Sequence, residues 1–149
     1  RNRDPRCPRR GPGPLIVVDA SVLVSALAGV GADAEWSTRQ LQGETLAAPA
    51  HAPFEAANVL RRLEAAGGMD KSAAALAHED LLVLPIHLFP FEAVAPRAWA
   101  LRHNATIYDG AYLALAEILD VALVTLDTRL AAVPTTSATV LLPTSSPGG

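Results

Sequence analysis

The fold is decided by two neighbouring stretches, Tyr108-Asp109-Gly110-Ala111-Tyr112-Leu113-Ala114-Leu115-Ala116-Glu117 and Val121-Ala122-Leu123-Val124-Thr125-Leu126-Asp127. The first has the apolar content and spacing of a packed helix, and a carboxylate, Asp109, lies near its start. The second is typical of a buried strand, and it ends on another carboxylate, Asp127. The pair therefore predicts a helix that leads into a buried strand, with an acid at the start of one and at the end of the other.

Two earlier segments place an acid in the same way. Asp19 ends the apolar run 15–18, and Glu55 lies in the first turn of a helix that opens at Pro53. In α/β proteins the carboxyl ends of the strands form the edge of the sheet at which ligands bind. We therefore expect all four acids to meet at that edge.

The rest of the chain alternates between strand and helix signals. Strands are expected at 15–18, 46–48, 85–90, 121–126 and 139–142, and helices at 20–28, 33–43, 53–66, 70–82, 95–104, 109–120 and 128–133. The fifth helix is expected to start near residue 95 because Pro96 restricts where a helix can begin. Strands separated by helices predict an α/β fold, with a parallel sheet and helices on both of its faces.

Composition indicates one globular domain. The 149 residues are 50% hydrophobic, and no apolar run approaches the roughly 20 residues that a membrane helix needs. Five of the 12 basic residues and one of the 15 acidic residues fall within 1–14, which leaves seven basic and 14 acidic residues, a net charge of −7, for the remainder. This balance argues against a nucleic-acid binder that works through a simple basic patch. Carboxylates that bind divalent cations would account for part of it.

The two ends of the chain differ from the rest. Residues 1–14 hold five arginines and the single cysteine, Cys7, and we expect a disordered basic leader there, without the apolar middle of a signal peptide. Residues 144–149 are expected to form a flexible tail, so that 15–143 is the folded domain. One cysteine excludes an internal disulfide, which fits a reducing, cytoplasmic location.

Several side-chain environments can be predicted from helical spacing. Phe54 is assigned to the buried face of its helix, and Tyr108 and Tyr112 to a buried stripe of theirs. The acids outside the set of four, among them Glu117, are expected to be solvated. The four histidines show no spacing typical of metal ligands.

The four acids suit metal-dependent cleavage of phosphodiester bonds. Mg²⁺ and Mn²⁺ prefer hard oxygen ligands, and such ions activate a water and stabilise the charge on the leaving oxygen. Each acid also has a simpler explanation, because aspartate is a good N-cap and acids suit the first turn of a helix. Taken singly, each acid favours that explanation. Four acids at matching positions favour a site.

Five segments resemble a known family. They are 17–21 (Val-Val-Asp-Ala-Ser), 53–62 (Pro-Phe-Glu-Ala-Ala-Asn-Val-Leu-Arg-Arg), 97–102 (Arg-Ala-Trp-Ala-Leu-Arg), 108–117 and 123–130. In this order the chain resembles PIN-domain proteins, and specifically the VapC-type toxins of bacterial toxin–antitoxin pairs. The helix that begins Tyr-Asp, followed by a strand that ends Thr-x-Asp, is the specific part of the match.

The resemblance implies a PIN fold with a five-stranded parallel sheet and a ribonuclease that needs Mg²⁺ or Mn²⁺. It also implies a VapB-type antitoxin as partner, RNA as substrate and a homodimer. Asp19 and Asp109 fall on the positions of the core metal ligands, while Glu55 and Asp127 would complete the catalytic site or act through water. One departure is Gly110, where alanine is usual, and it should loosen the first turn by roughly 0.5–1 kcal/mol.

Five further residues are candidates for supporting roles. By the same resemblance, Ser21 and Thr125 fall on hydroxyl positions that support the acids. Asn58 shares a helical stripe with the second acid and could orient a ligand. Arg62 and Arg129 could contact RNA phosphates, although surface salt bridges are the favoured explanation for both.

Three alternatives remain open. A PIN nuclease that processes RNA without an antitoxin would share the fold and the acids. The small size of the chain favours the toxin over this alternative. A domain that binds metal or RNA but has lost catalysis would share them too. A phospho-receiver module also has aspartates at strand ends, but it needs a lysine after a late strand. The single lysine, Lys71, is predicted in a helix, which disfavours this reading.

Overall fold

The computed structural model describes residues 13–144, which form a five-stranded parallel sheet covered by helices. The strands are β1 (Leu15–Val18), β2 (Thr45–Pro49), β3 (Ile86–Phe89), β4 (Leu123–Val124) and β5 (Val140–Leu141). The helices are α1 (Ala20–Ala28), α2 (Ala32–Leu41), α3 (Ala52–Ala65), α4 (Lys71–Val83), α5 (Phe91–Ala100), α6 (Ile107–Leu119) and α7 (Thr128–Ala131). Their order is the one expected from the sequence. Within residues 13–144, no helix combines the length and the apolar content needed to cross a bilayer.

The sheet has the order β3-β2-β1-β4-β5, with β1 at its centre. Val17 of β1 pairs with Ala47 of β2 on one side and with Leu123 of β4 on the other. The chain first builds outward from β1 to β2 and β3, and then returns to place β4 beside β1. Open α/β sheets bind ligands in the crevice at such a reversal, outside the carboxyl ends of the strands. Here that crevice lies at the ends of β1 and β4.

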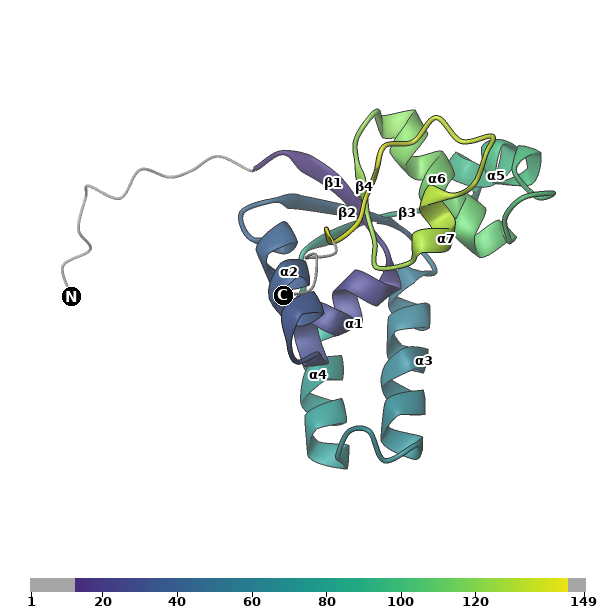
Figure 1. The fold of residues 1–149 in the computed structure, drawn as a ribbon. Coiled ribbons are helices and arrows are strands. Elements are labelled where there is room, and N and C mark those ends of the chain that lie inside the picture. The colour runs from purple at the N-terminus through teal and green to yellow at the C-terminus, as the bar shows by residue number, and fades with distance from the viewer. Residues whose placement is uncertain (1–12, 145–149) are drawn as a thin grey trace, which may run out of the picture.

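Helices cover both faces of the sheet, which confirms the predicted α/β architecture. Helices α1 to α4 lie on one side, and α5 and α6 on the other (Figure 1). The hydrophobic core divides accordingly. Val18 packs with residues of α1, α3 and α4, whereas Val17 packs with the buried side of α6. Adjacent residues of β1 therefore enter opposite halves of the core, as the period of a strand requires.

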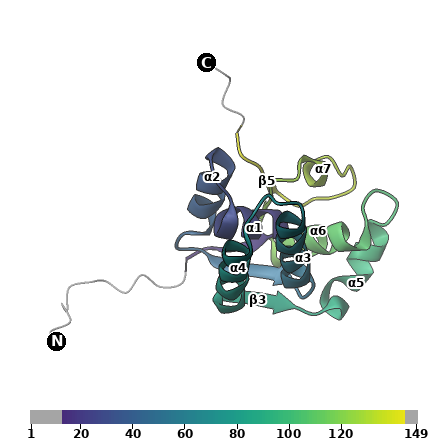
Figure 2. The same cartoon turned by 90° about the horizontal axis from the view of Figure 1, so that it is seen from below.

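Helices α3 and α4 project from the sheet as a pair, which Figure 2 shows from below. Helix α3 opens at the sheet edge with Pro53 in its first turn, where the missing N–H of proline costs nothing. Helix α4 begins after Asp70, whose side chain accepts a hydrogen bond from Ala73 N at 2.9 Å. Because the first turn of α3 lies at the edge, Glu55 is brought to the crevice.

The described chain begins inside the stretch predicted as leader. The carbonyl oxygens of Gly13 and Pro14 accept hydrogen bonds from Thr45 Oγ1 and Thr45 N, at 2.9 and 3.0 Å. These bonds attach residues 13 and 14 to β2. The predictions for residues 1–12 and 145–149 lie outside the described residues.

Helix α5 begins earlier than expected, at Phe91 rather than near residue 95, and Pro96 lies inside it. The expected start was wrong by about one turn. Proline in a helix removes one backbone hydrogen bond, and Pro96 is the sixth of the ten residues of α5. Val94 and Ala98 are 1% and 0% exposed. Their burial outweighs the lost bond.

Two aromatic side chains that were assigned to the core are exposed. Phe54 is 79% and Tyr108 is 62% exposed, so both assignments were wrong. Helix α3 instead buries the stripe through Ala56 and Leu60, which is turned away from Phe54. Tyr112, one turn after Tyr108 on α6, is buried as expected.

Glu117 was expected to be solvated, but its carboxylate instead accepts hydrogen bonds from two other segments of the chain. Its carboxylate accepts hydrogen bonds from Arg97 Nε at 2.6 Å, from Thr136 Oγ1 at 2.8 Å and from Ser137 N at 2.8 Å. Arg97 and, more weakly, the other donors lower the pKa of Glu117 to about 2, although burial opposes them. The network ties α5 and α6 to the chain that leads into β5.

Candidate active site

The four expected acids line one cavity at the carboxyl edge of the sheet. We call it the acidic cavity; its volume is about 440 Å³. Its lining includes the side chains of Asp19, Ser21, Glu55, Asn58, Arg62, Asp109, Tyr112, Asp127 and Arg129. Four separate segments of the chain thus bring their carboxylates to one place, as the sequence predicted.

Asp19 is the most buried of the four acids, at 6% exposure. It follows β1 and caps α1, because its Oδ1 accepts a hydrogen bond from Val22 N at 3.2 Å. Ser21 Oγ donates to the same oxygen at 2.6 Å, and Thr125 Oγ1 donates to Oδ2 at 2.5 Å. The capping explanation and the expected support from two hydroxyls are therefore both realised in this one side chain.

The backbone after β4 orients the two hydroxyls. Leu126 N donates to Ser21 Oγ at 3.1 Å, and Asp127 N donates to Thr125 Oγ1 at 2.9 Å. A hydroxyl that accepts from a backbone N–H still has one hydrogen to donate. Both hydroxyls can therefore donate to Asp19, which fixes its carboxylate between the ends of β1 and β4.

The charge of Asp19 is only partly compensated by the chain. Burial raises the pKa of Asp19 above its ordinary value, while the hydrogen bonds from Ser21, Thr125 and Val22 act in the opposite direction and do not cancel it. The negative charge of Asp127 adds to the rise. A cation in the cavity would supply the missing compensation.

Glu55 is held by two aromatic residues, His51 at the N-cap of its own helix α3 and Tyr112 of α6. Tyr112 OH donates to Glu55 Oε1 at 3.0 Å. His51 Nε2 lies 2.9 Å from the same oxygen, in a contact between charges when the imidazole is protonated rather than in an aligned hydrogen bond. Burial alone would raise the pKa of Glu55, but the contacts with His51 and Tyr112 outweigh it and lower the pKa. Glu55 is thus kept ionised.

Asp127 is paired with Arg129. Its Oδ1 accepts from Arg129 N at 2.9 Å, which caps α7, and the guanidinium donates to both carboxylate oxygens, with a shortest distance of 2.6 Å. The hydrogen bonds from Arg129 lower the pKa of Asp127 in spite of its partial burial. The salt bridge favoured for Arg129 is therefore present, and its contact with a phosphate stays a prediction.

Asp109 lies in the first turn of α6, where its N–H donates to Oγ1 of the N-cap Thr106 at 3.1 Å. Within residues 13–144 its carboxylate takes part in no hydrogen bond or ion pair, so both oxygens are available to a ligand. Asn58 and Arg62 line the cavity from α3. Asn58 Oδ1 accepts from Arg61 Nε at 3.0 Å, and its role toward a ligand stays a prediction.

The chain matches the model of the PIN domain over residues 16–135. The chain belongs to the PIN-domain family. Ribonuclease VapC12 of Mycobacterium tuberculosis is 38% identical over 117 residues, which cover 78% of this chain and 90% of that protein. Ribonuclease VapC1 of the same organism is 40% identical over 122 residues, covering 79% and 90%. The predicted family, a PIN domain similar to the VapC group, is confirmed.

Solved structures share the PIN fold. PAE2754 from Pyrobaculum aerophilum matches with a TM-score of 0.61 at 25% identity, covering 84% of this chain and 81% of that one. A toxin–antitoxin complex from Klebsiella pneumoniae matches with a TM-score of 0.56 at 18% identity, covering 87% and 98%. Because the second match is only 18% identical, it bears on the fold alone. The PIN-like fold expected from the sequence is confirmed.

The donor set of the PIN domain fits a hydrated divalent ion. Its oxygens are the hard ligands that Mg²⁺ and Mn²⁺ prefer, and Asp19 carries a charge that its hydrogen bonds do not balance. In the described part of the chain, no three His, Cys, Asp or Glu side chains are grouped closely enough to enclose a metal ion. Mg²⁺ is commonly bound through one or two carboxylates and keeps several waters. Asp19 and Asp109 would then be direct ligands, with Glu55 and Asp127 acting through water.

Sequence reasoning missed the two residues that hold Glu55. His51 precedes Glu55 by four positions, and this helical spacing was a signal that the two side chains could meet. Tyr112 follows Asp109 by three positions on α6, so it shares a face with that acid. That spacing places Tyr112 beside the acidic cavity as well as in the core.

Proposed function

We propose that this PIN domain is a metal-dependent endoribonuclease and the toxin of a VapBC-type toxin–antitoxin pair. The observation that carries the proposal is the acidic cavity, in which four carboxylates meet at the crevice of a parallel sheet. The names of the VapC ribonucleases that it resembles support the class of reaction. The reaction is hydrolysis of RNA phosphodiester bonds with Mg²⁺ or Mn²⁺, in the cytoplasm.

Each acid has its own part in the proposed reaction. Asp19 and Asp109 would hold the ion, which supplies an activated water and stabilises the charge on the leaving oxygen. The two hydroxyls fix the carboxylate of Asp19 before any ligand arrives. Glu55, kept ionised by its aromatic neighbours, and Asp127, placed by its arginine, would orient water beside the scissile phosphate.

Cleavage of a structured RNA pool tests this proposal. Protein freed of bound partners is incubated with Mg²⁺, with Mn²⁺ or with a chelator, beside the variants Asp19→Asn and Asp109→Asn. We expect cleavage only with metal, and a loss of more than roughly 100-fold in each variant. Asp33→Asn, which alters an exposed acid of α2, is the matched control and should cleave normally. Cleavage that survives the chelator and both substitutions contradicts the proposal.

Metal binding is measured separately from cleavage. A ligand at ten times its dissociation constant stabilises a protein by about 1.4 kcal/mol. Mn²⁺ should therefore raise the melting temperature of the parent protein, and the rise should be lost in Asp19→Asn. A protein that binds Mn²⁺ through Asp19 but cuts no RNA would support the alternative of a catalytically inactive binding domain.

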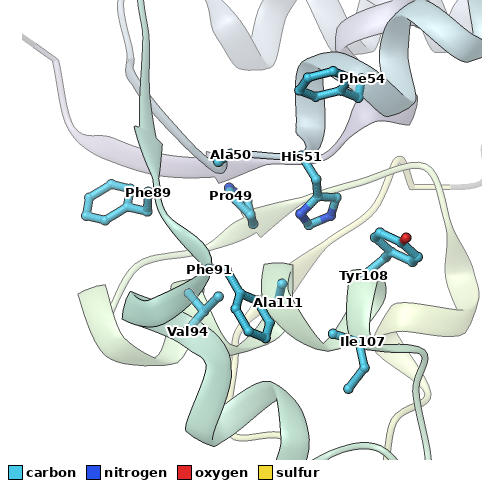
Figure 3. Close-up of a pocket in the computed structure, with 10 residues that line it drawn as sticks. All are labelled: Pro49, Ala50, His51, Phe54, Phe89, Phe91, Val94, Ile107, Tyr108 and Ala111. Carbon is cyan, nitrogen blue, oxygen red and sulfur yellow. The ribbon is translucent and has the colours of Figure 1, made fainter.

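We also propose a homodimer, formed through an aromatic surface beside the acidic cavity. A second cavity of about 600 Å³ is lined mainly by aromatic and aliphatic side chains, and Figure 3 shows how they surround it. Phe54, Phe91 and Tyr108 at this cavity are 79%, 60% and 62% exposed. Exposed apolar patches of this kind mark interaction surfaces. Light scattering should give twice the mass of the chain, and Phe54→Asp should give a monomer.

The antitoxin partner is proposed to be a small VapB-type protein with a basic segment. Four carboxylates and two arginines line the acidic cavity, so a cationic inhibitor would be attracted to it. Co-expression of such a small basic protein should restore growth to cells that produce this chain. If cells that produce this chain alone grow normally although the chain cleaves RNA, the RNA-processing alternative is supported.

A further inference from the structure

A third cavity, of about 460 Å³, adjoins the acidic cavity on the side of α7. We call it the basic cavity. Asp109 and Arg129 line both cavities, so they share a wall. The basic cavity is otherwise formed by the connection between α5 and α6, with Arg102, His103 and Thr106, and by the end of α7.

The two cavities differ in charge. Four carboxylates line the acidic cavity, whereas Asp109 is the single acid that lines the basic cavity, against the two cations Arg102 and Arg129. Thr106 is the N-cap of the 13-residue α6, whose positive end adds to the same side. The charge of Arg129 is largely balanced by Asp127. Arg102 therefore supplies the positive charge that is left to meet a ligand, and the imidazole of His103 adds a hydrogen-bonding group beside it.

Arg102 is held in place without losing its ability to bind. Its guanidinium carbon lies 4.7 Å from the centre of the Trp99 ring, and Nη1 donates to Trp99 O at 2.9 Å. This contact uses one of the five N–H donors of the guanidinium. Trp99 is itself 61% exposed, so the stacking does not bury the arginine. The side chain of His103 makes no hydrogen bond or ion pair with another residue of 13–144.

We propose that the basic cavity binds a phosphate of the RNA strand that neighbours the phosphate being cut. The proposal rests on the proposed nuclease function. A strand whose scissile phosphate lies at Asp19 and Asp109 must carry its neighbouring phosphates over the surface beside the acidic cavity. Residues 15–149 carry a net charge of −7, so most positions would repel those phosphates. Arg102 supplies a cationic position directly beyond Asp109, and His103 adds a hydrogen-bonding group beside it.

Such a contact would position the strand and would not read its sequence, because phosphates carry no base identity. It predicts that the strand crosses the shared wall of the two cavities, from the carboxyl end of β4 toward the connection between α5 and α6. The position of the cut relative to the neighbouring phosphate would then be set by the distance between the two cavities.

Binding of a fluorescent ten-nucleotide oligouridylate tests the proposal. The full chain carries Asp19→Asn so that it does not cut, and fluorescence anisotropy is recorded at 50–200 mM KCl. Arg102→Gln should raise the dissociation constant roughly fivefold and reduce the salt slope by about 0.7. Arg102→Lys, which keeps the charge, should retain most of the affinity. The control is Arg39→Gln, an exposed arginine of α2 outside all of these cavities, which should change neither quantity.

The outcomes separate this proposal from the proposed function. If the parent protein binds the oligouridylate and Arg102→Gln behaves like Arg39→Gln, the phosphate site is wrong and the nuclease proposal stands. If the Asp19→Asn chain does not bind the oligouridylate and the unsubstituted protein cuts no RNA, both are wrong. An equal loss on oligouridylate and oligoadenylate supports a phosphate contact, whereas a loss on one of them alone would overturn it in favour of a base contact. Thermal melts confirm that each variant is folded.

Discussion

Thr125 Oγ1 donates a 2.5 Å hydrogen bond to Asp19 Oδ2, between residues that lie 106 positions apart in the chain. Thr125 is completely buried, and its oxygen also accepts from Asp127 N. One hydroxyl therefore joins the ends of β1 and β4 and touches two of the four acids. The carboxylate of Asp19 is fixed by the fold itself and not by its own helix alone.

Replacing Thr125 by valine removes this hydroxyl at almost constant volume. Asp19 Oδ2 loses a donor and Asp127 N loses its acceptor, so Thr125→Val should reduce stability by roughly 1–3 kcal/mol. Cleavage should fall about 10- to 100-fold, because the ligand carboxylate is no longer oriented. Urea unfolding and RNA cleavage measure the two effects. Thr125→Ser keeps the hydroxyl and should retain most activity; equal activity in both variants would show that the hydroxyl is not needed.

Tyr112→Phe tests the support of Glu55. Burial and the carboxylate of Glu55 raise the pKa of Tyr112 well above its usual range, so the phenol stays a donor throughout the working pH range. Without that donor the pKa of Glu55 should rise, and cleavage should fall about tenfold. Tyr108→Phe is the control on the same helix, since its hydroxyl donates to no other residue of 13–144. The pH dependence of cleavage should shift upward in Tyr112→Phe alone.

The element order and the meeting of the four acids could be predicted because both depend on local signals. Apolar runs identified β1 and β4, and each is followed within three residues by an acid that caps the next helix. Parallel strands carry such ends to one edge of the sheet whatever the details of packing. The meeting of the acids at 19, 55, 109 and 127 could therefore be predicted without knowledge of tertiary contacts.

The errors concern residues whose environment is set by tertiary packing. Glu117 is 20 positions from Arg97, and nothing in the local pattern joins the two. Tyr112 reaches Glu55 across 57 positions. Phe54 has the spacing of a core residue, but the face that α3 buries is chosen by what packs against it. Local pattern identifies an element well and its buried face less well.

Gly110 is explained by a close approach between helices. A Cβ at this position would lie 3.3 Å from the carbonyl oxygen of Ala98 and 3.4 Å from its Cα, so α6 touches the backbone of α5 there. Gly110→Ala should gain roughly 0.5–1 kcal/mol of helix propensity and lose a similar amount to crowding, which leaves the melting temperature nearly unchanged. Gly110→Val should cost about 1–3 kcal/mol, because α5 must move.

Ala75→Val is the control for Gly110→Val, because residue 75 is an exposed position of α4 where the branched side chain meets no neighbouring helix. It measures the cost of a branched residue in a helix by itself. Thermal melts of the two variants give the comparison. A Gly110→Val protein as stable as Ala75→Val would mean that the contact between α5 and α6 is looser than the 3.3 Å separation indicates.

Glu117 predicts a dependence of stability on pH. Its pKa is about 2 in the folded protein against an ordinary value of 4.5, so the ionised form favours folding above pH 4.5 and this contribution declines as the pH falls from 4.5 toward 2. Glu117→Gln should therefore be less stable than the parent at pH 7, by roughly 2 kcal/mol, a figure reduced because Arg97 is partly solvated. The difference between the two proteins should shrink below pH 4.5.

Urea unfolding at pH 7, 5, 4 and 3 measures that difference directly. Glu64→Gln removes the same charge from an exposed position of α3 and is the matched control; it should change stability little at any of these pH values. If Glu117→Gln lost the same stability at pH 3 as at pH 7, the ionised carboxylate would not be the cause, and packing of the side chain against the segment before β5 would explain the loss. A gap that closes with acid assigns the effect to the ion pair with Arg97.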